Sequence, residues 1–498
     1  MILPHRSRLL LFVLLLGCAS VARSAGLGDP SARSPVPPFE WRLPAGFPVP
    51  VAPADNPMTP AKVELGRRLF YDRVLSGNGT QACSSCHRQE LAFTDGRARA
   101  VGSTGEPHPR SAMSLANVAY SVTLTWADPR LTRLEDQARI PMFSEHPVEL
   151  GLAGREDEVL HRLRAETDYP GMFAAAFPEE PEAVSLSNVT RAIASFERTL
   201  ISGDSPYDRL VYRDDAGALS ESAKRGMRLF FSERLNCSRC HGGFTFSGPI
   251  AFEGARPIAA TFHNNGLYNL GGDGNYPADN PGLFAITVLA EDMGRFRAPT
   301  LRNVELTAPY MHDGSIATLP EVVEHYARGG RLVPDGPFAG DGHDSPRKSE
   351  LMRGFGLDDR GKADLVEFLK SLTDRPFVGD PRFAAPPSAA TEELGTARRS
   401  GSLRRAAPRA GRWGSRRSPG SRTPCPGTGS HHSLLHGGLI TGLPWSLAID
   451  RFRCREADLD ITSRPAARCP RGQKRNLACT VAMVDAVASA GKALPGWK

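Results

Sequence analysis

The pentapeptide Cys-x-x-Cys-His occurs twice in this chain of 498 residues, as "CSSCH" at 83–87 and as "CSRCH" at 237–241. Two thiols three positions apart, followed at once by a histidine, suit covalent attachment of haem. The thiols add to the two vinyl groups, and the imidazole ligates the iron. The alternative is zinc, which requires such pairs to come together around one ion. The histidine after each pair and the export signal described below favour haem. We therefore expect two c-type haems, held by Cys83, Cys86 and His87 and by Cys237, Cys240 and His241.

The segment before each pentapeptide is repeated as well. The pattern Gly-x-Arg-Leu-Phe stands at 66–70 before the first copy and at 226–230 before the second. A helix that leads into Cys-x-x-Cys-His in both places indicates the internal repeat of a whole domain.

Apolar residues at helical spacing predict a mainly α-helical body with long loops, and strand signals are scarce. Ser187 is expected to cap the helix predicted within 185–202. Helices are expected over 60–72, 156–177, 185–202, 222–234, 318–330 and 358–374, with a long loop over 271–282.

Composition divides the chain into five segments. The Pro-rich leader is expected to be ordered only where Trp41 and Phe47 can dock. The expected segments are a signal peptide (1–25), the leader (26–55), a first cytochrome c domain (56–205), a second (206–378) and a basic, low-complexity, disordered tail (379–498).

The N-terminus is typical of an export signal. Arg6 and Arg8 precede an apolar run at 9–17 that is too short to span a bilayer. Cys18 in "LLGCAS" resembles the acylated cysteine of a lipoprotein, and the alternative is ordinary cleavage near 22–25. Both predict a periplasmic protein. Outside the leader and the tail, cysteines occur only in the pentapeptides, so no disulfide framework is expected.

The net charge of +7 does not point to nucleic acid. The basic excess lies in the tail, and the body is mildly acidic without a basic stripe.

Three longer motifs carry a resemblance. "LGRRLFYDRVLS", "LEDQARIPMFSEHPVELG" and "FRAPTLRNVELTAPYMHDGSIATLPEVVEHY" together resemble the bacterial di-haem cytochrome c peroxidase family, over about residues 40–375. The resemblance implies two cytochrome-c-like helical domains with one haem each and a calcium ion between them. It also implies that peroxide reacts at the N-terminal haem and that the C-terminal haem exchanges electrons.

The resemblance assigns roles around the N-terminal haem. Gln137 matches the active-site glutamine of the family, and Glu149 matches its acid–base glutamate, which moves a proton between the peroxide oxygens. Pro141 matches a distal-pocket residue that discourages a sixth iron ligand. Trp126 matches the tryptophan between the two haems. From the residues alone, Glu149 could equally be a surface charge and Trp126 a core residue.

Tyr326 is the most informative position. It lies fourteen residues after His312 of "HDG", where many members of the family place a Met on the C-terminal iron. A phenolate ligand favours ferric and higher iron states, whereas Met raises the potential. Tyrosine here resembles the MauG-like subgroup, including the di-haem enzymes of methanobactin operons. The alternative is a Tyr packed on its helix without an iron bond.

His108 and the calcium site depart from the family pattern. Some members carry a distal His ligand, but further upstream than His108, so we expect a five-coordinate N-terminal iron. Calcium is implied through the backbone carbonyls of Thr307 and Pro309. The family has Asn after Arg110, whereas this chain has Ser111.

Three functions follow as hypotheses. The first is an exported enzyme that uses hydrogen peroxide to form a high-valent di-haem state and oxidises a Trp of a partner protein. The second is a conventional peroxidase that detoxifies hydrogen peroxide with electrons from a cytochrome c or cupredoxin. The third is a di-haem electron carrier. Tyr326 favours the first over the second, and Gln137 with Glu149 favours an enzyme over the carrier.

Overall fold

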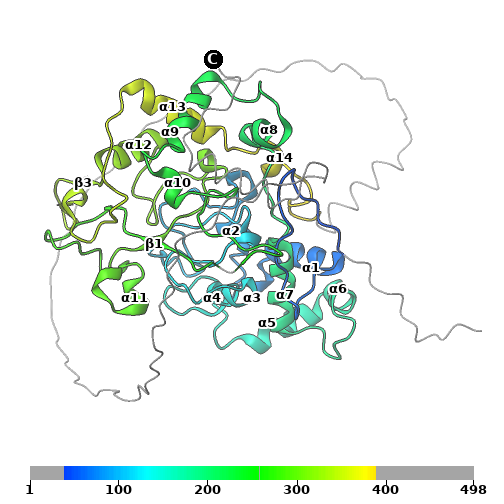
Figure 1. Ribbon diagram of the computed structural model, residues 1–498. Coiled ribbons are helices and arrows are strands. Elements are labelled where there is room, and N and C mark those ends of the chain that lie inside the picture. Colours follow the sequence, from blue (N-terminus) through cyan, green and yellow to red (C-terminus); the bar gives the residue numbers. More distant parts are fainter. Residues whose placement is uncertain (1–38, 257, 388–498) are drawn as a thin grey trace, which may run out of the picture. The chain divides into compact units, whose positions relative to one another are not determined.

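The computed structural model describes residues 39–256 and 258–387 (Figure 1). We refer to residues 39–205 as the first half and to 206–387 as the second half. The described part is mainly helical with long loops, which confirms the expected fold class.

The helices of the described part include those that were predicted, with 156–177 divided into two, and several that were not. In the first half these are α1 (Pro60–Tyr71), α2 (Cys83–Cys86), α3 (Leu134–Gln137), α4 (Arg139–Phe143), α5 (Glu156–Ala165), α6 (Tyr169–Ala176) and α7 (Leu186–Glu197). In the second half they are α8 (Pro206–Arg213), α9 (Glu221–Phe230), α10 (Cys237–Cys240), α11 (Phe284–Thr287), α12 (Leu319–Arg328), α13 (Asp359–Lys370) and α14 (Arg375–Val378). Single 3₁₀ turns are η1 (Arg73–Leu75), η2 (Gln89–Leu91), η3 (Val118–Tyr120), η4 (Ala290–Asp292), η5 (Val304–Leu306) and η6 (Gly342–Asp344).

Strands are short and lie in the second half. β1 (Phe262–His263) pairs antiparallel with β2 (Phe296–Arg297), with His263 opposite Phe296. β3 (Leu332–Val333) pairs antiparallel with β4 (Gly340–Asp341) in a small hairpin.

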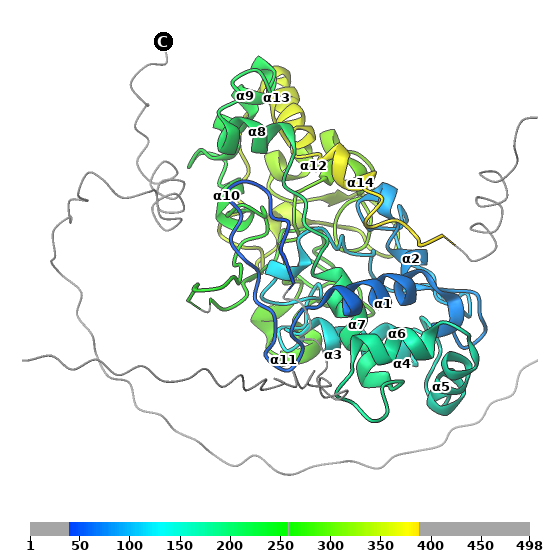
Figure 2. The same cartoon turned by 90° about the vertical axis from the view of Figure 1, so that its right-hand side faces the viewer.

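The repeated sequence pattern forms the same helix crossing in each half. In Figure 2, α1 lies beside α7, and α9 lies beside α13. A Cβ atom on Gly66 would overlap the carbonyl oxygen of Ala192, and one on Gly226 would overlap that of Asp364. Only glycine lets the two backbones approach so closely. The repeat is therefore one of a helix pair with a glycine at its contact point.

Helix ends mostly follow their capping residues. Thr318 and Glu321 form a capping box at the start of α12. The cap predicted for α7 was wrong by two residues. Ser185, in an extended conformation, accepts a hydrogen bond from the Asn188 amide, and Ser187 lies inside the first turn.

The core of the first half is completed by residues from the far end of the described chain. Phe377 and Phe383 belong to the same buried cluster as α1 and α7. The hydroxyl of Tyr71 donates to the carbonyl of Phe383 at 2.6 Å. The carbonyl of Ala384 also accepts from Arg67, so Phe383 and Ala384 pack against α1, which corrects the expectation that the disordered tail begins at 379. The rest of the tail and the export signal with Cys18 lie outside the described residues.

The leader segment docks through Phe47. Its buried ring lies 4.6 Å from that of Phe244, and the Arg302 guanidinium lies 4.9 Å above it. Arg302 is itself fully buried and forms a bidentate pair with Asp208 at 2.8 Å. Buried charges of this kind are strongly destabilising when one partner is removed. Trp41 is half-buried against Phe39.

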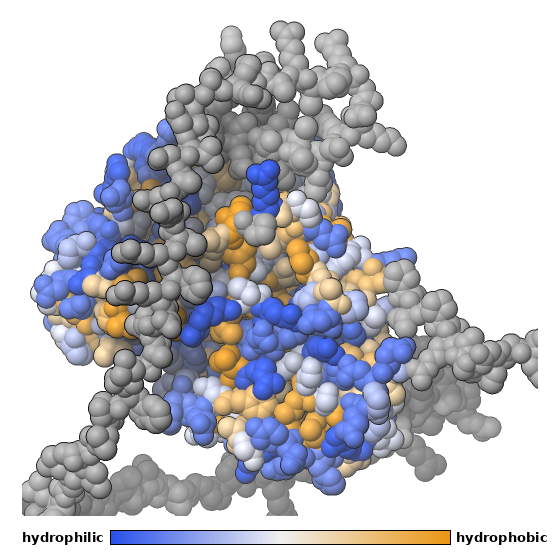
Figure 3. All heavy atoms as spheres, turned by 60° about the horizontal axis from the view of Figure 1, so that its bottom comes forward, coloured by the Kyte–Doolittle hydropathy of each residue, from blue (hydrophilic) through white to orange (hydrophobic). Residues whose placement is uncertain are grey.

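Within the described residues, no helix is both long and apolar enough to cross a bilayer. On the face drawn in Figure 3, hydrophobic patches are broken up by hydrophilic residues.

Candidate functional site

Each Cys-x-x-Cys-His lies at a cavity of its own. The first two cysteines form α2, and His87 follows at its C-terminal end. The Nδ1 of His87 lies 2.9 Å from the carbonyl oxygen of Phe93. Because a carbonyl only accepts, Nδ1 carries the proton, and the Nε2 lone pair is left free for a metal. Burial lowers the pKa of His87 and keeps the ring neutral.

The predicted peroxide-handling residues line this same first cavity. Gln137, Pro141 and Glu149 all contribute to its wall. Their place follows from two contacts. Buried Glu135 in α3 pairs with Arg198 at 2.9 Å, which fixes α3 against α7. Gly102 allows the 100–108 loop to approach the backbone of Val148, next to Glu149, where a Cβ would overlap.

Burial raises the pKa of Glu149 to about 7. A carboxyl group with this pKa can both accept and return a proton near neutral pH. The side chain remains partly exposed to the cavity, with a relative accessible surface of 25%.

His108 reaches the first cavity too. Its Nδ1 accepts a hydrogen bond from the Arg110 amide at 3.1 Å. In the neutral ring the proton must then be on Nε2, which lies 4.0 Å from Oε1 of Glu149. Burial lowers the pKa of His108 and favours this neutral form. In this orientation the Nε2–H group is a possible donor to Glu149. The only lone pair of the ring, on Nδ1, accepts from Arg110 and is not free for a metal.

The sequence interpretation missed Glu197, the last residue of α7. It lines the first cavity and is 6% exposed, and its Oε2 has no hydrogen-bond partner among the described residues. Burial raises the pKa of Glu197 to about 8. Its position in an apolar helical pattern, just before Arg198, was the available signal in the sequence.

The second cavity is larger, about 430 Å³ against about 60 Å³. His241 follows α10 and lies 3.2 Å from two carbonyls, those of Phe246 and Pro299. Burial lowers the pKa of His241 to about 4. Here again the Nδ1 proton is engaged and Nε2 is free.

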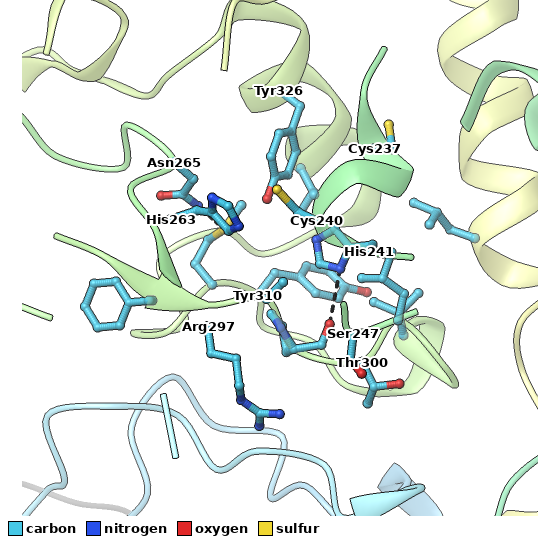
Figure 4. Close-up of a pocket in the computed structure, with 18 of the residues that line it drawn as sticks. Cys237, Cys240, His241, Ser247, His263, Asn265, Arg297, Thr300, Tyr310 and Tyr326 are labelled. Atoms are coloured by element: carbon cyan, nitrogen blue, oxygen red, sulfur yellow. Dashed lines mark hydrogen bonds between the residues drawn. The ribbon is translucent and has the colours of Figure 1, made fainter. Parts of the chain in front are cut away.

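Tyr326 points into this second cavity from α12. Figure 4 shows its hydroxyl directed toward Cys240, with His241 beside them and Asn265 on the neighbouring loop. Burial raises the pKa of Tyr326, and a hydrogen bond with the Asn265 side chain acts in the opposite direction. A phenolate here therefore requires a nearby cation.

Arg297 is a second residue that the sequence interpretation missed. It extends from β2 into the cavity (Figure 4), and its guanidinium contacts only the Thr125 carbonyl at 3.3 Å and the Met113 sulfur at 3.5 Å. Among the described residues no carboxylate pairs with it, and burial lowers the pKa of Arg297 to about 10. A buried, unpaired cation calls for an anionic group in the cavity.

The two cavities meet at Leu115, which lines both. Trp126 lines the second cavity, and its indole Nε1 donates to the carbonyl of Ser111 at 2.9 Å. Thr307 and Pro309 line the same cavity, and no hydrogen bond reaches their carbonyl oxygens in the described part.

These observations fit haem and not zinc. Each cavity has a pair of free thiols and a neutral histidine with Nε2 available, and the second also has an unpaired cation suited to a propionate. Within 39–256 and 258–387, no three His, Cys, Asp or Glu side chains converge to hold a metal ion, as a zinc site would require. In the smaller first cavity it is the two thiols and His87, rather than the volume, that indicate haem.

Comparisons with known proteins agree with this arrangement. A family model described as di-haem cytochrome c peroxidase matches residues 60–216. The chain is 34% identical to the methylamine utilization protein MauG of Methylorubrum extorquens, over 72% of this chain and 90% of that protein. It is 35% identical to the cytochrome-c peroxidase IdrP1 of Pseudomonas sp. strain SCT, over 74% of this chain and 93% of that protein.

A solved structure is similar over nearly its whole length. This MauG-like protein, associated with microbial copper homeostasis, is 48% identical with a TM-score of 0.68, and the match covers 70% of this chain and 99% of that one.

Proposed function

The chain belongs to the di-haem cytochrome c peroxidase family, and from this premise we propose that it uses hydrogen peroxide to oxidise a tryptophan side chain of a partner protein. Family membership makes the protein an oxidoreductase and implies two c-type haems. Because the family consists of enzymes, the hypothesis of a simple di-haem electron carrier is no longer supported.

We assign the haems to the repeated motifs. Cys83 and Cys86 attach one haem with His87 as its iron ligand, and Cys237, Cys240 and His241 hold the other. When bound, the haem pair supplies the iron chemistry with peroxide and stores the oxidising equivalents. The support is the free Nε2 of each buried histidine.

Glu149 takes the proton from the inner peroxide oxygen and returns it to the leaving oxygen. Its pKa of about 7 suits both steps. Gln137 orients peroxide by hydrogen bonding, and Pro141 fills the wall without offering an iron ligand. The His108 Nε2–H faces Glu149 at 4.0 Å and its Nδ1 is engaged by the Arg110 amide, so His108 in this orientation would not ligate the first iron.

Tyr326 is the residue that favours oxidation of a partner protein over the conventional peroxidase reaction. Tyr326 lines the same cavity as His241 and would be able to ligate the second haem, and a phenolate ligand would make that site a poor electron acceptor and a good store for an oxidising equivalent. Trp126, in the wall of the same cavity, conducts electrons between the two haems. The chain's 48% identity to a MauG-like protein associated with microbial copper homeostasis supports this choice and suggests a partner in that setting.

Calcium and export complete the proposal. The carbonyls of Thr307 and Pro309 are free to bind calcium, and the hydroxyl of Ser111 donates to the Met311 carbonyl at 3.2 Å, which leaves its oxygen able to serve as a further ligand. Metal analysis of the holoenzyme before and after EGTA tests this. The N-terminal segment directs the protein to the periplasm, and intact-mass analysis separates cleavage near 22–25 from acylation of Cys18.

A conventional peroxidase is the second candidate, because His108 lies in the first cavity. In that case His108 would be a ligand of the first iron, and a cytochrome c or cupredoxin would supply the electron that precedes reaction with peroxide.

Rapid mixing of the fully oxidised holoenzyme with hydrogen peroxide distinguishes the two. We expect an immediate change in haem absorbance, followed by oxidation of a partner Trp. If nothing changes until one haem is reduced, and His108→Ala then reacts without reduction, the conventional peroxidase is correct. The Tyr326→Met variant should show a raised potential at the second haem and lose partner oxidation while still reacting with peroxide.

A further inference from the structure

A row of aromatic rings leads away from Trp126 on the side opposite the first cavity. The centroid of its indole lies 6.4 Å from the ring of His312, which lies 6.2 Å from that of Tyr276. Tyr276 lies 5.5 Å from Tyr268, and Tyr268 lies 5.8 Å from Phe338. The first four are half-buried or buried, whereas Phe338 in the β3–β4 hairpin is 40% exposed. The row therefore connects the cavity wall to the surface.

The two tyrosines in the row differ in what their hydroxyl groups touch. Tyr268 donates to Oδ2 of Asp313 at 2.7 Å. Tyr276 donates to the side-chain oxygen of Asn264 at 2.9 Å. A tyrosine loses an electron readily only if its proton can leave at the same time, because the oxidised phenol is a strong acid. A carboxylate can take that proton, and an amide oxygen is too weak a base.

Asp313 is available for this purpose. Burial opposes its ionisation, but His312 and the Tyr268 hydroxyl outweigh that effect and hold the pKa of Asp313 below its usual value. The residue is therefore a carboxylate at neutral pH. The guanidinium of Arg331 lies 5.9 Å from the Tyr268 ring, on the side near the surface.

We propose that Tyr268 and Asp313 form a proton-coupled relay that carries the oxidising equivalent from Trp126 to an aromatic side chain of a partner at the β3–β4 hairpin. Tyr276 and His312 provide the packed medium through which the electron passes. This inference rests on the proposed function and adds the route and the exit surface to it.

The step balances in both directions. Tyr268 gives one electron to the oxidised Trp126 and its phenolic proton to Asp313, leaving a neutral tyrosyl radical and a protonated carboxyl. The partner's tryptophan then gives one electron to Tyr268, and Asp313 returns the proton. Hydrogen peroxide, the oxidant of the proposed function, supplies the equivalents, and each passage moves one of them.

The first half contains a matched control. Tyr169 is equally buried and donates to Oδ2 of Asp72, also at 2.7 Å, with the Arg68 guanidinium 5.2 Å from its ring. In the described part its only ring neighbour is Phe173, at 6.2 Å, and no row of rings joins it to Trp126. Tyr169 therefore has the same hydrogen-bonded carboxylate as Tyr268 but is not connected to Trp126 by aromatic rings.

The test uses the oxidised holoenzyme, one equivalent of hydrogen peroxide and N-acetyltryptophanamide as the electron donor. We expect Tyr268→Phe to react with peroxide as the native chain does but to oxidise the probe about tenfold more slowly or worse. Freeze-quench EPR should show a tyrosyl radical in the native chain that narrows with ring-deuterated tyrosine and is missing in Tyr268→Phe. Tyr169→Phe should keep both the radical and the rate.

The outcomes separate the relay from the function on which it rests. If the native holoenzyme does not react with peroxide or oxidise the probe, the proposed function fails and the relay with it. If it does both and Tyr268→Phe matches it in radical and rate, only the relay is overturned. Should Tyr268→Phe fail to retain haem, Asp313→Asn removes the proton acceptor of Tyr268 and must slow the probe as well. An unchanged rate in that variant, or an EPR signal indifferent to tyrosine deuteration, rejects the relay.

Discussion

The two halves of the molecule share a scaffold and differ in what surrounds it. Both place a Cys-x-x-Cys-His after a helix whose glycine contacts a second helix, and both engage the histidine Nδ1 with a backbone carbonyl. The first cavity then acquires Glu149 and Gln137, whereas the second acquires Tyr326 and Arg297. The divergent residues lie outside the repeated helix pair, on loops, on other helices and, for Arg297, on β2. A duplicated helix pair can thus hold two haems in the same way, while the residues that line the two cavities give the haems different functions.

The largest expected effect concerns Glu149, which distinguishes the chemistry of the first cavity from that of the second. Glu149→Gln should slow the reaction of the oxidised holoenzyme with peroxide by about 10²–10⁴-fold, because the amide cannot take the proton. Stopped-flow haem absorbance measures this rate. Glu233→Gln is the control, since Glu233 lines the other cavity and is exposed. Equal losses in the two variants would mean that peroxide chemistry is not confined to the first cavity.

The scaffold comparison is tested at the two glycines. Gly66→Ala and Gly226→Ala should each lower the free energy of unfolding by about 1–3 kcal/mol, because the added methyl group meets a backbone carbonyl. Gly171→Ala in α6 has open space around it and should gain up to about 1 kcal/mol. Thermal unfolding of the holoenzyme gives all three values. A neutral result at one crossing alone would show that the halves are not packed alike.

The pH dependence sharpens the difference between the sites. Glu149 must be ionised to accept a proton, and its pKa is raised to about 7 by burial, so the peroxide rate should rise about tenfold between pH 6 and pH 8. Stability should move in the opposite direction. The pKa of Glu149 is about 7 in the folded state and 4.5 in the unfolded state, so the folded state binds this proton more tightly. The resulting contribution to stability is present below pH 4.5 and is lost as the pH rises through 7. A pH profile that is equally steep in Glu149→Gln would assign the titration to another group.

The smallest expected effect concerns the charge in the second cavity. Arg297→Gln removes a buried cation and should lower the reduction potential of the second haem by less than about 60 mV, the value of a tenfold change for one electron. The first haem should not change. Arg295→Gln serves as the control, since Arg295 is 40% exposed and pairs with Asp292. Spectroelectrochemical titration resolves both haems, and equal shifts at the two would mean that Arg297 acts at a distance.

Local patterns predicted the helices and the thiol pairs, since both depend on residues close together in the sequence. The 3.6-residue periodicity of 60–72 and 222–234 became α1 and α9. Gln137 and Glu149 came from the family resemblance, and the structure brings them to the same wall. Glu197 and Arg297 could not be found in this way. Their significance depends on the absence of a partner, which only the folded chain reveals.

Other differences have equally local causes. The cap of α7 was misplaced because two serines compete within three residues, and only the backbone conformation of Ser185 decides between them. Residues 379–386 look featureless in sequence, yet Phe383 is buried in the core of the first half, and the carbonyls of Phe383 and Ala384 accept hydrogen bonds from Tyr71 and Arg67 of α1.

The return of Phe377 and Phe383 to the core of the first half has a consequence for biosynthesis. Both rings lie near the end of the second half, so a ribosome releases the whole first half and most of the second before them, and the first half emerges with part of its core still unfilled. A gene truncated before that point would encode both haem motifs and yield a first half with an open hydrophobic face.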